Sequence, residues 1–384
     1  MYIIIKHVRF HPTIKINYIL MNKIFIILSL SVLWACSNQK EVSIVDSFKT
    51  TQPLVHKVLE IENVANELLD PYSLAVSGNI INVCNPRSPK IFATIDIAKK
   101  RVIKHWGTMG QGPNEFMGLI DMYNNYSETG LNIWHGWTQE LYFFSQSNLE
   151  SDSTYYQIIP TGLSKANTEN PGKHEFAYTL VQLDTLLFFT TGGSNNTLFT
   201  LFDLKNNESK GVGAFPAKDD INSQMPAWQR KIAYNGRIRY NSSLKKLIYM
   251  AWDCEMFEIY NVNGTNVELA MGNYTTIPRY RNASKDGRTL FVEFLGNGKG
   301  RNRGLTISDE NIFILYQDYE KAGIFKPTDY NNRANMVLVF DWDGNPVKLY
   351  MLDCFVEGLD YDKSTNRLYA VSNNPYPAIV YFEL

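Results

Sequence analysis

The chain of 384 residues lacks a dominant charge, because 37 Lys and Arg oppose 38 Asp and Glu and leave a net charge of −1. Without a basic excess there is no long-range attraction for a polyanion, so we expect no nucleic acid partner. Histidine is scarce, with six residues, and no nucleophile-elbow, HExxH, Walker or EF-hand pattern occurs. Asp341, Asp343 and Gly344 resemble the start of a calcium loop, but the later Glu is missing, which favours a hairpin turn. We therefore expect no metal and no cofactor, and the missing motifs favour a non-catalytic protein without deciding against an enzyme.

Cysteine is scarce as well, with four residues. Those after Cys36 are Cys84, Cys254 and Cys354. An odd number at wide spacing, without a CxxC pair, is typical of neither a disulfide framework nor a zinc site. We expect buried thiols, with a single Cys84–Cys354 bridge as the alternative.

The apolar stretch near the N-terminus, residues 24–33, is far shorter than the roughly 20 residues that span a bilayer. It follows a Lys and leads into Leu33, Ala35 and Cys36, which match the lipobox of bacterial lipoproteins. In that pattern signal peptidase II cuts before a cysteine that becomes diacylated. Trp34 stands where a small residue is usual, so a plain signal peptide with an incidental cysteine is the alternative.

This pattern predicts an exported protein. Residues 1–36 form the signal region, with Met21 as the true start and Cys36 as the lipidation site. The polar residues 37–51 form a tether to the folded part. We expect a location in the cell envelope, anchored by lipid at the outer membrane and facing either the periplasm or the exterior.

Aromatic residues are abundant, with 23 Tyr, 21 Phe and 7 Trp, which favours strands over helices. One kind of segment recurs about every 50–65 residues, as a turn followed by a run of aliphatic and aromatic residues. The six runs are residues 79–84, 130–135, 185–190, 246–252, 311–317 and 367–372. Their spacing predicts six repeated units.

Each run is followed by an alternating segment and then a turn, which we interpret as the third strand and the hairpin to a fourth. The third strands are residues 90–97, 140–145, 198–204, 256–263 and 336–344, and the fourth strands are residues 101–105, 155–159, 211–215, 267–271 and 347–352. Four antiparallel strands in six units predict an all-β fold, a six-bladed β-propeller spanning residues 52–384.

The last unit ends one strand short. Its strands are expected at residues 356–361, 367–372 and 378–384, after which the chain stops. Residues 54–61 have strand character and no unit of their own. We expect this N-terminal strand to complete the last blade and to close the ring, which removes an exposed edge.

A short motif carries a family resemblance. Residues 105–116 read HWGTMGQGPNEF, with these motif positions: Gly107, Gly110, Gly112, Pro113, Glu115 and Phe116. The motif resembles the GxGPxEF element of the TolB-like six-bladed propeller lipoproteins of Bacteroidetes, although Asn114 replaces the usual Gly. The resemblance implies the fold and the export route, and it implies no established activity. The residues themselves favour a structural blade connector, because glycine permits positive φ, proline fixes a turn and Glu115 can cap backbone amides.

A ligand site is expected at one mouth of the central channel, where long loops gather on a rigid scaffold. Aromatic rings there can stack on a sugar or an aromatic side chain, and arginine can bind an anion or a carboxylate. The candidates are Arg87, Trp137, Trp228, Trp252, Asp253, Arg279, Arg281 and Asp318. Core packing for the tryptophans and a solvated loop for the arginines are the alternatives.

These patterns favour a monomeric, non-catalytic binding or scaffold protein for a glycan, a peptide or an envelope protein. The alternative is a hydrolase or lyase that acts on a glycan or lactone at the same mouth, with its carboxylates drawn from Glu115, Asp253 and Asp318. A third alternative is an assembly subunit, which a large exposed apolar patch would indicate.

Overall fold

The computed structural model describes residues 43–62, 68–110, 112, 115–116, 118, 120–124, 130–161, 163, 177–183, 185–191, 196–217, 225, 227–282, 292–295, 300–319, 334–373 and 375–384. The chain divides into two units, Met1–Val42 and Ser43–Leu384, and every described residue belongs to the second. The predicted signal region, Cys36 and residues 37–42 lie outside the described residues. Among the described residues, no helix is long and apolar enough to cross a membrane.

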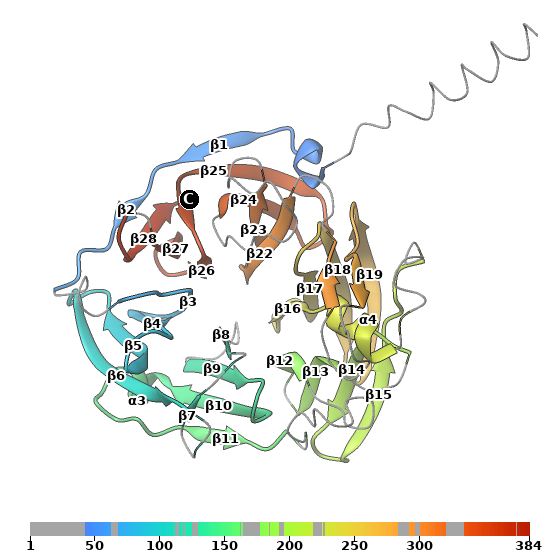
Figure 1. Cartoon of the computed structure of the whole chain (residues 1–384), viewed down its shortest axis with the longest axis horizontal. Helices are drawn as coiled ribbons and strands as arrows, with labels where there is room; N and C mark the ends of the chain where they lie inside the picture. The colour runs from blue at the N-terminus through green and yellow to red at the C-terminus, as the bar shows by residue number, and fades with distance from the viewer. Residues whose placement is uncertain are drawn as a thin grey trace, which may run out of the picture. The chain divides into compact units, whose positions relative to one another are not determined.

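The described unit is a ring of six antiparallel sheets, and this confirms the predicted six-bladed β-propeller (Figure 1). Blade 1 contains β3 (Ser73–Ser77), β4 (Ile80–Cys84), β5 (Lys90–Asp96) and β6 (Arg101–Met109), with β7 (Glu115–Phe116) parallel to β6. Blade 2 contains β8 (Ile120–Tyr123), β9 (Gly130–His135), β10 (Glu140–Ser145) and β11 (Gln157–Ile159). Blade 3 contains β12 (Ala177–Leu183), β13 (Leu186–Thr191), β14 (Phe199–Asp203) and β15 (Glu208–Val212).

The second half of the ring follows the same order. Blade 4 contains β16 (Gly236–Asn241), β17 (Lys246–Ala251), β18 (Met256–Asn263) and β19 (Asn266–Tyr274). Blade 5 contains β22 (Gly300–Ile307), β23 (Asn311–Asp318), β24 (Ala334–Asp341) and β25 (Pro346–Val356). Blade 6 contains β26 (Gly358–Asp362), β27 (Arg367–Ser372) and β28 (Ala378–Glu383). The first strand of each blade lines the central channel.

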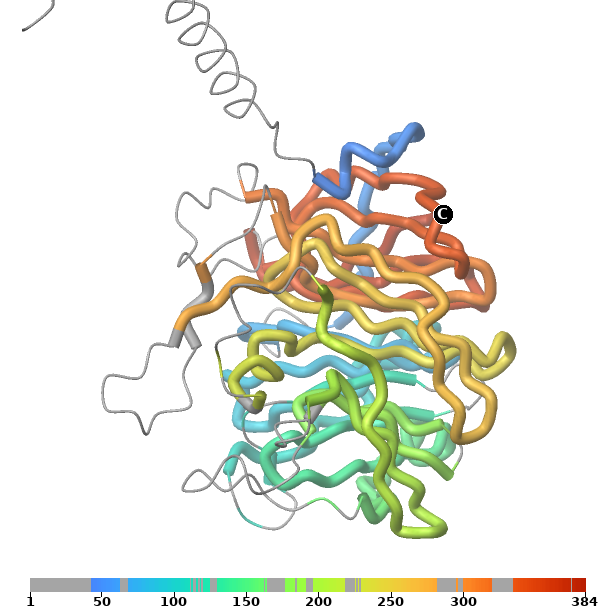
Figure 2. Tube along the Cα trace, turned by 90° about the vertical axis from the view of Figure 1, so that its right-hand side faces the viewer, coloured from blue at the N-terminus to red at the C-terminus, as the bar shows by residue number. Residues whose placement is uncertain are grey.

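Short elements decorate the ring. They are the helices α3 (Gln146–Leu149) and α4 (Ala227–Ala233), and a hairpin of β20 (Tyr280–Asn282) and β21 (Val292–Phe294). Figure 2 shows the hairpin and α4 on the same face of the ring. Both belong to connections between blades: α4 lies between β15 and β16, and the hairpin lies between β19 and β22.

The second strand of each blade is buried on both faces, because each sheet packs between two neighbouring sheets. β4 and β9 are buried at every position. A strand covered on both sides is apolar throughout rather than alternating, and this explains why the second strands carried the repeat signal. The fourth strands are more exposed and were less accurately predicted. β15, for example, begins three residues before the expected 211–215.

The predicted ring closure is confirmed. β2 (Lys57–Val58) pairs antiparallel with β28, with Lys57 opposite Tyr381 and Val58 opposite Val380. The amide of Leu59 then donates to the carbonyl of Ile379 at 2.9 Å. A second contact was not predicted: β1 (Thr51–Leu54) pairs in parallel with β25 and adds a fifth strand to blade 5.

The prediction of a free tether over residues 37–51 needs correction from Ser43 onward. Residues Ile44–Ser47 form a 3₁₀ helix, η1. The Ser43 hydroxyl donates to Glu255 Oε1 at 2.7 Å, and Ile44 is only 1% exposed in a cluster with blades 4 and 5. Burial of Ile44 and the capping of η1 by Ser43 hold this segment on the propeller.

The three cysteines of the folded unit are free thiols. Cys84 and Cys254 are buried, and Cys354 is half-buried. The expectation of buried thiols is therefore confirmed for Cys84 and Cys254 but not for Cys354, and the alternative Cys84–Cys354 bridge is wrong.

Loss of the closing segment should destabilise the ring. A chain that begins at Glu62 lacks η1, β1 and β2, and with them four buried side chains: Ile44, Leu54, Leu59 and Ile61. At about 1.5–3 kcal/mol for each buried aliphatic side chain, its free energy of unfolding should fall by about 6 kcal/mol or more relative to a chain that begins at Ser43. Urea denaturation measures the difference. The exposed edge of β28 should also promote self-association, seen by size-exclusion chromatography. Equal denaturation midpoints for the two chains would show that closure contributes no stability.

Candidate ligand site at the channel mouth

A cavity of about 420 Å³ opens at one mouth of the central channel. The inner strands β8, β12, β16 and β22 supply residues near their N-terminal ends, and the β17–β18 turn, α4 and β20 supply the rest. The lining residues are Ile120, Asp121, Tyr178, Thr179, Ile232, Asn235, Gly236, Arg237, Trp252, Asp253, Tyr280 and Arg303. This is the mouth at which the sequence predicted a site.

Strand geometry places the charged side chains. Residues two apart on a strand share a face, so Arg237 and Arg239 on β16 follow one another on one side of the strand. Gly236 begins β16 close to β17, because a Cβ at this position would lie 2.1 Å from the Met250 carbonyl oxygen. A larger residue would push the start of the strand, and Arg237 with it, away from blade 4.

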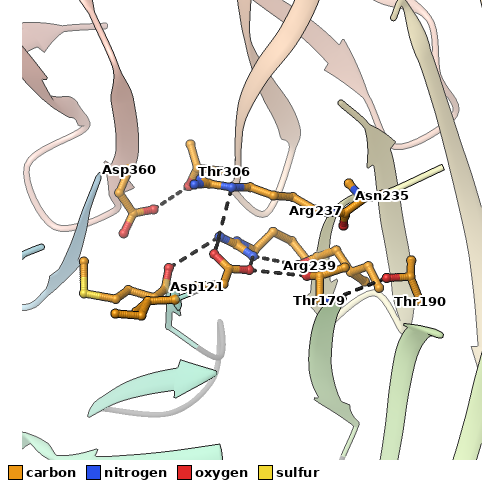
Figure 3. A network of polar contacts seen from close by, with 12 residues as sticks. Asp121, Thr179, Thr190, Asn235, Arg237, Arg239, Thr306 and Asp360 are labelled. Atoms are coloured by element: carbon orange, nitrogen blue, oxygen red, sulfur yellow. Dashed lines mark hydrogen bonds and ion pairs between the residues drawn. The ribbon is translucent and has the colours of Figure 1, made fainter. Parts of the chain in front are cut away.

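A buried ion pair crosses the channel from blade 4 to blade 2 (Figure 3). The two terminal nitrogens of Arg239 donate to the two carboxylate oxygens of Asp121, each at 3.1 Å. The Thr179 hydroxyl on blade 3 donates to the same carboxylate at 3.4 Å. Burial alone would raise the pKa of Asp121, but Arg239 and then Arg237 outweigh it, so the pKa lies below its ordinary value. Asp121 is therefore ionised at neutral pH.

A second carboxyl group links the remaining three blades (Figure 3). Asp360 on β26 accepts from the Thr306 hydroxyl on β22 at 2.6 Å and from the amide of Val76 on β3 at 2.8 Å. Burial raises the pKa of Asp360 above its ordinary value. Together with Asp121, this group joins the inner strands of all six blades through polar contacts.

The second charged wall is built around Asp253, in the turn between β17 and β18. Asp253 has φ of 48°, a left-handed conformation that Asp tolerates better than most residues. Its carboxylate accepts from Arg301 Nη1 at 2.8 Å and from the Tyr280 hydroxyl at 3.0 Å. Arg303 lies 3.5 Å from the same oxygen that accepts from Arg301. These contacts hold the turn, the β20 hairpin and blade 5 together.

Two guanidinium groups lie over one indole ring. The guanidinium carbons of Arg237 and Arg303 are 5.0 Å and 5.3 Å from the Trp252 ring centroid. Both contacts lie within the range of a cation–π interaction. Trp252 therefore helps to hold Arg237 of blade 4 and Arg303 of blade 5 at the cavity wall.

The sequence profile described as TolB-like 6-blade propeller-like matches residues 47–364. The chain belongs to this family. Among solved structures, a member of the DUF4221 family from Bacteroides vulgatus is similar, with a TM-score of 0.50 and 11% identity over 86% of this chain and 96% of that chain. A protein from Bacteroides fragilis is also similar, with a TM-score of 0.48 and 9% identity over 87% of this chain and 98% of that chain. At 11% identity the likeness to the Bacteroides vulgatus protein supports the fold alone. No curated protein matches the sequence.

The motif that suggested the TolB-like family forms a turn that Glu115 and Phe116 hold against blades 1 and 2. The Gly112 amide donates to Glu115 Oε2 at 2.7 Å, and Gly107 has φ of 68° beside the Phe92 ring. A Cβ on Gly110 would collide with the Glu115 carboxylate. Phe116 is buried against Phe92, Trp106, His135 and Tyr142. Pro113 lies outside the described residues.

Of the predicted ligand-binding residues, Trp252 and Asp253 line the cavity of this TolB-like propeller. The Arg87 side chain is 77% exposed and pairs with Asp70 at 2.9 Å. Trp137 is 42% exposed in the turn after β9, and Asp318 is half-buried at the end of β23. None of these three residues belongs to the cavity lining.

Four arginines of the connection between blades 4 and 5 and of the strand that follows it differ in burial. Arg279 and Arg281 are exposed at the start of the β20 hairpin, whereas Arg301 and Arg303 lie on β22 and are largely buried. Trp228 belongs to α4, but its side chain lies outside the described residues. The other ten lining residues were not among the predicted ligand-binding residues, and they include Asp121, Tyr178 and Arg237. The Arg-x-Arg spacing at 237–239 and 301–303 was a signal, but the exposed pair Arg279 and Arg281 has the same spacing.

One group of potential metal ligands occurs among the described residues, at the closing segment. His56, Asp353 and Cys354 place ligand atoms within 4.8 Å of one another. His56 already contacts Asp353, through Nδ1 at 2.9 Å and the amide at 3.0 Å. Burial and then the charge of Asp353 raise the pKa of Cys354 to about 12, which disfavours the thiolate that a metal requires. The hydrogen bonds account for this cluster without an ion.

Substitution Asp121→Asn should be strongly destabilising, because it leaves Arg239 buried without its counter-charge. Breaking a buried pair in this way costs about 3–5 kcal/mol, measured by urea denaturation at pH 7. Glu383→Gln is the matched control, since Glu383 pairs with Arg367 and Lys57 on the surface, where an ion pair is screened by solvent and contributes little to stability.

The effect of Asp121→Asn should depend on pH. A carboxyl group with a lowered folded pKa stabilises the fold above its unfolded pKa of about 3.9. This contribution is lost as the pH falls through the lower folded pKa. The difference in unfolding free energy between wild type and Asp121→Asn should therefore stay constant from pH 7 to about pH 4 and shrink below it. A difference that grew on acidification would contradict an ionised Asp121.

Proposed function

We propose that the protein is an exported, lipid-anchored β-propeller of the cell envelope that binds a small ligand in the channel-mouth cavity. Membership of the TolB-like family and the propeller fold support a binding or scaffold protein. The single observation that carries the proposal is the cavity itself, where buried charged side chains and aromatic rings surround open space. Buried charges are costly to maintain, and their convergence on a hollow is typical of recognition sites.

A binding role fits the carboxyl groups better than catalysis does. Asp121 and Asp253 both line the cavity, which is the observation that favours the alternative of a hydrolase or lyase. A general acid must be protonated at neutral pH, and Arg239 keeps the pKa of Asp121 low. Asp253 is already bound by Arg301 and Tyr280, and Glu115 is occupied by the Gly112 amide.

A ligand should perturb the fluorescence of Trp252, which lies in the cavity wall. The test uses the chain from Ser37 onward, which contains the whole compact unit, titrated with glycans, peptides and small acids. We expect a saturable change in tryptophan emission that Trp252→Phe abolishes. Trp137→Phe is the matched control, because Trp137 is exposed and away from the cavity lining.

Two results would count against this role. A response lost in Trp137→Phe and kept in Trp252→Phe would place the ligand elsewhere. Conversion of a glycan or lactone in the same samples would favour the hydrolase or lyase.

The anchor is tested separately. We expect the full chain to incorporate a labelled fatty acid in a bacterial host and to fractionate with membranes, and Cys36→Ser to lose both properties. Cys354→Ser is the matched control, since Cys354 is a free thiol within the fold. Labelling that persists in Cys36→Ser would contradict lipidation at the predicted site.

A further inference from the structure

We infer that the ligand of the cavity is a small ring compound with an acidic group, such as a sugar acid, whose anionic group binds between Arg237 and Arg303. The inference rests on the proposed function, because it names the ligand class of that same site. Three observations carry it: the balance of charge around the cavity, the different distances of four arginines from the cavity carboxylates, and the aromatic lining.

The charge balance favours an anion. Two neighbouring inner strands each carry a pair of arginines two residues apart: Arg237 and Arg239 on β16, and Arg301 and Arg303 on β22. Two cavity carboxylates, Asp121 and Asp253, face these four guanidinium groups. Asp360 is the third carboxyl group of the network, and its burial favours the neutral acid. Among these seven groups, positive charge therefore exceeds negative charge.

The four arginines divide into two kinds. Arg239 and Arg301 hold the carboxylates at 3.1 Å and 2.8 Å. Arg237 and Arg303 lie farther from the same carboxylates, at 3.9 Å and 3.5 Å, and these are the two arginines that line the cavity. Arg239 and Arg301 thus hold the aspartates of the cavity wall in place. Arg237 and Arg303 are the arginines that face the cavity.

Desolvation of Arg237 and Arg303 strengthens their electrostatic interaction with an anion. The side chains of Arg237 and Arg303 are only 12% and 15% exposed. Burial, and then the charge of Arg301, lowers the pKa of Arg303 to about 10, and burial lowers the pKa of Arg237. Both pKa values are lowered first by burial, which removes water from the positive charges. An anion placed between them would lie in a site of low dielectric constant, where a charge-assisted hydrogen bond is strong.

The ring specificity follows from the other lining residues. Trp252, Tyr178 and Tyr280 offer aromatic surface, and Asn235 and Thr179 offer polar groups. Aromatic faces bind rings, and amides and hydroxyls orient them. A volume of about 420 Å³ lies in the lower part of the range for small-molecule sites, which suits one or two sugar rings. A bare inorganic ion would leave most of it unfilled.

The test compares matched probes on the chain from Ser37 onward by isothermal titration calorimetry at fixed ionic strength. Glucuronate and galacturonate are the sugar acids, glucose and galactose are their neutral counterparts, and glucose 6-phosphate distinguishes a phosphate from a carboxylate. We expect at least one acidic sugar to bind at least about tenfold more tightly than its neutral counterpart, as one charged hydrogen bond predicts. The affinity should fall as salt is raised.

Variants locate the anionic group. Arg237→Gln and Arg303→Gln should each weaken the binding of the acidic sugar by at least about tenfold. Arg101→Gln is the matched control, because Arg101 is exposed at the start of β6. Arg303→Lys keeps the charge and should retain part of the affinity, which separates lost recognition from a lost fold. Thermal unfolding of each variant checks the fold.

The possible results separate the inferred ligand class from the proposed binding function. Equal binding of acidic and neutral sugars, or a cavity that takes only uncharged peptides, would overturn the inference and leave the proposed function standing. Acid binding that survives in both arginine-to-glutamine variants would also overturn it. Failure of all five probes to bind would overturn the inference, and the broader Trp252 titration would then decide whether the cavity binds any small ligand.

Discussion

A propeller is stable only when its ring is closed, and this chain closes it with a strand from the opposite terminus. Blade 6 ends at β28, and β2 covers the edge that would otherwise be open. The same segment then runs back along blade 5, where β1 pairs with β25, to the boundary of blades 4 and 5, where Ser43 and Ile44 are buried. Closure therefore fixes the position of Ser43, the first described residue. It also holds the inner strands at the spacing that their polar contacts require.

Those polar contacts explain why the mouth stays open. An apolar channel of this size could be filled by larger side chains, but buried arginines and carboxylates must each find partners in fixed directions. The Arg239–Asp121 pair spans blades 4 and 2, and Asp360 spans blades 5, 6 and 1. Figure 3 shows these contacts between the inner strands. Arg237, Arg303 and the aromatic residues line the cavity together with Asp121.

The sequence predicted the fold well and the site in part, for one physical reason. Second strands are covered on both faces and read as apolar runs, so their repeat was visible. First strands line the channel and mix polar with apolar residues, which weakens any pattern, and Asp121 and Arg237 were missed there. Trp252 and Asp253 were found because they follow a second strand directly. Arg279 was predicted and Arg303 was missed, because only the pairing of β22 with β23 brings Arg303 to the cavity, whereas Arg279 is exposed.

The turn between β17 and β18 connects the cavity wall with the N-terminal segment. Trp252 and Asp253 form the cavity wall, and Glu255, two residues later, holds the N-terminal segment through Ser43. Tyr316 of blade 5 also donates to Glu255, at 2.5 Å. Burial raises the pKa of Glu255, and the hydrogen bonds from Tyr316 and Ser43 partly offset this shift. A short turn whose side chains are held on both sides has little freedom to move. The docked N-terminal segment thus supports the wall against which Arg237 and Arg303 are positioned.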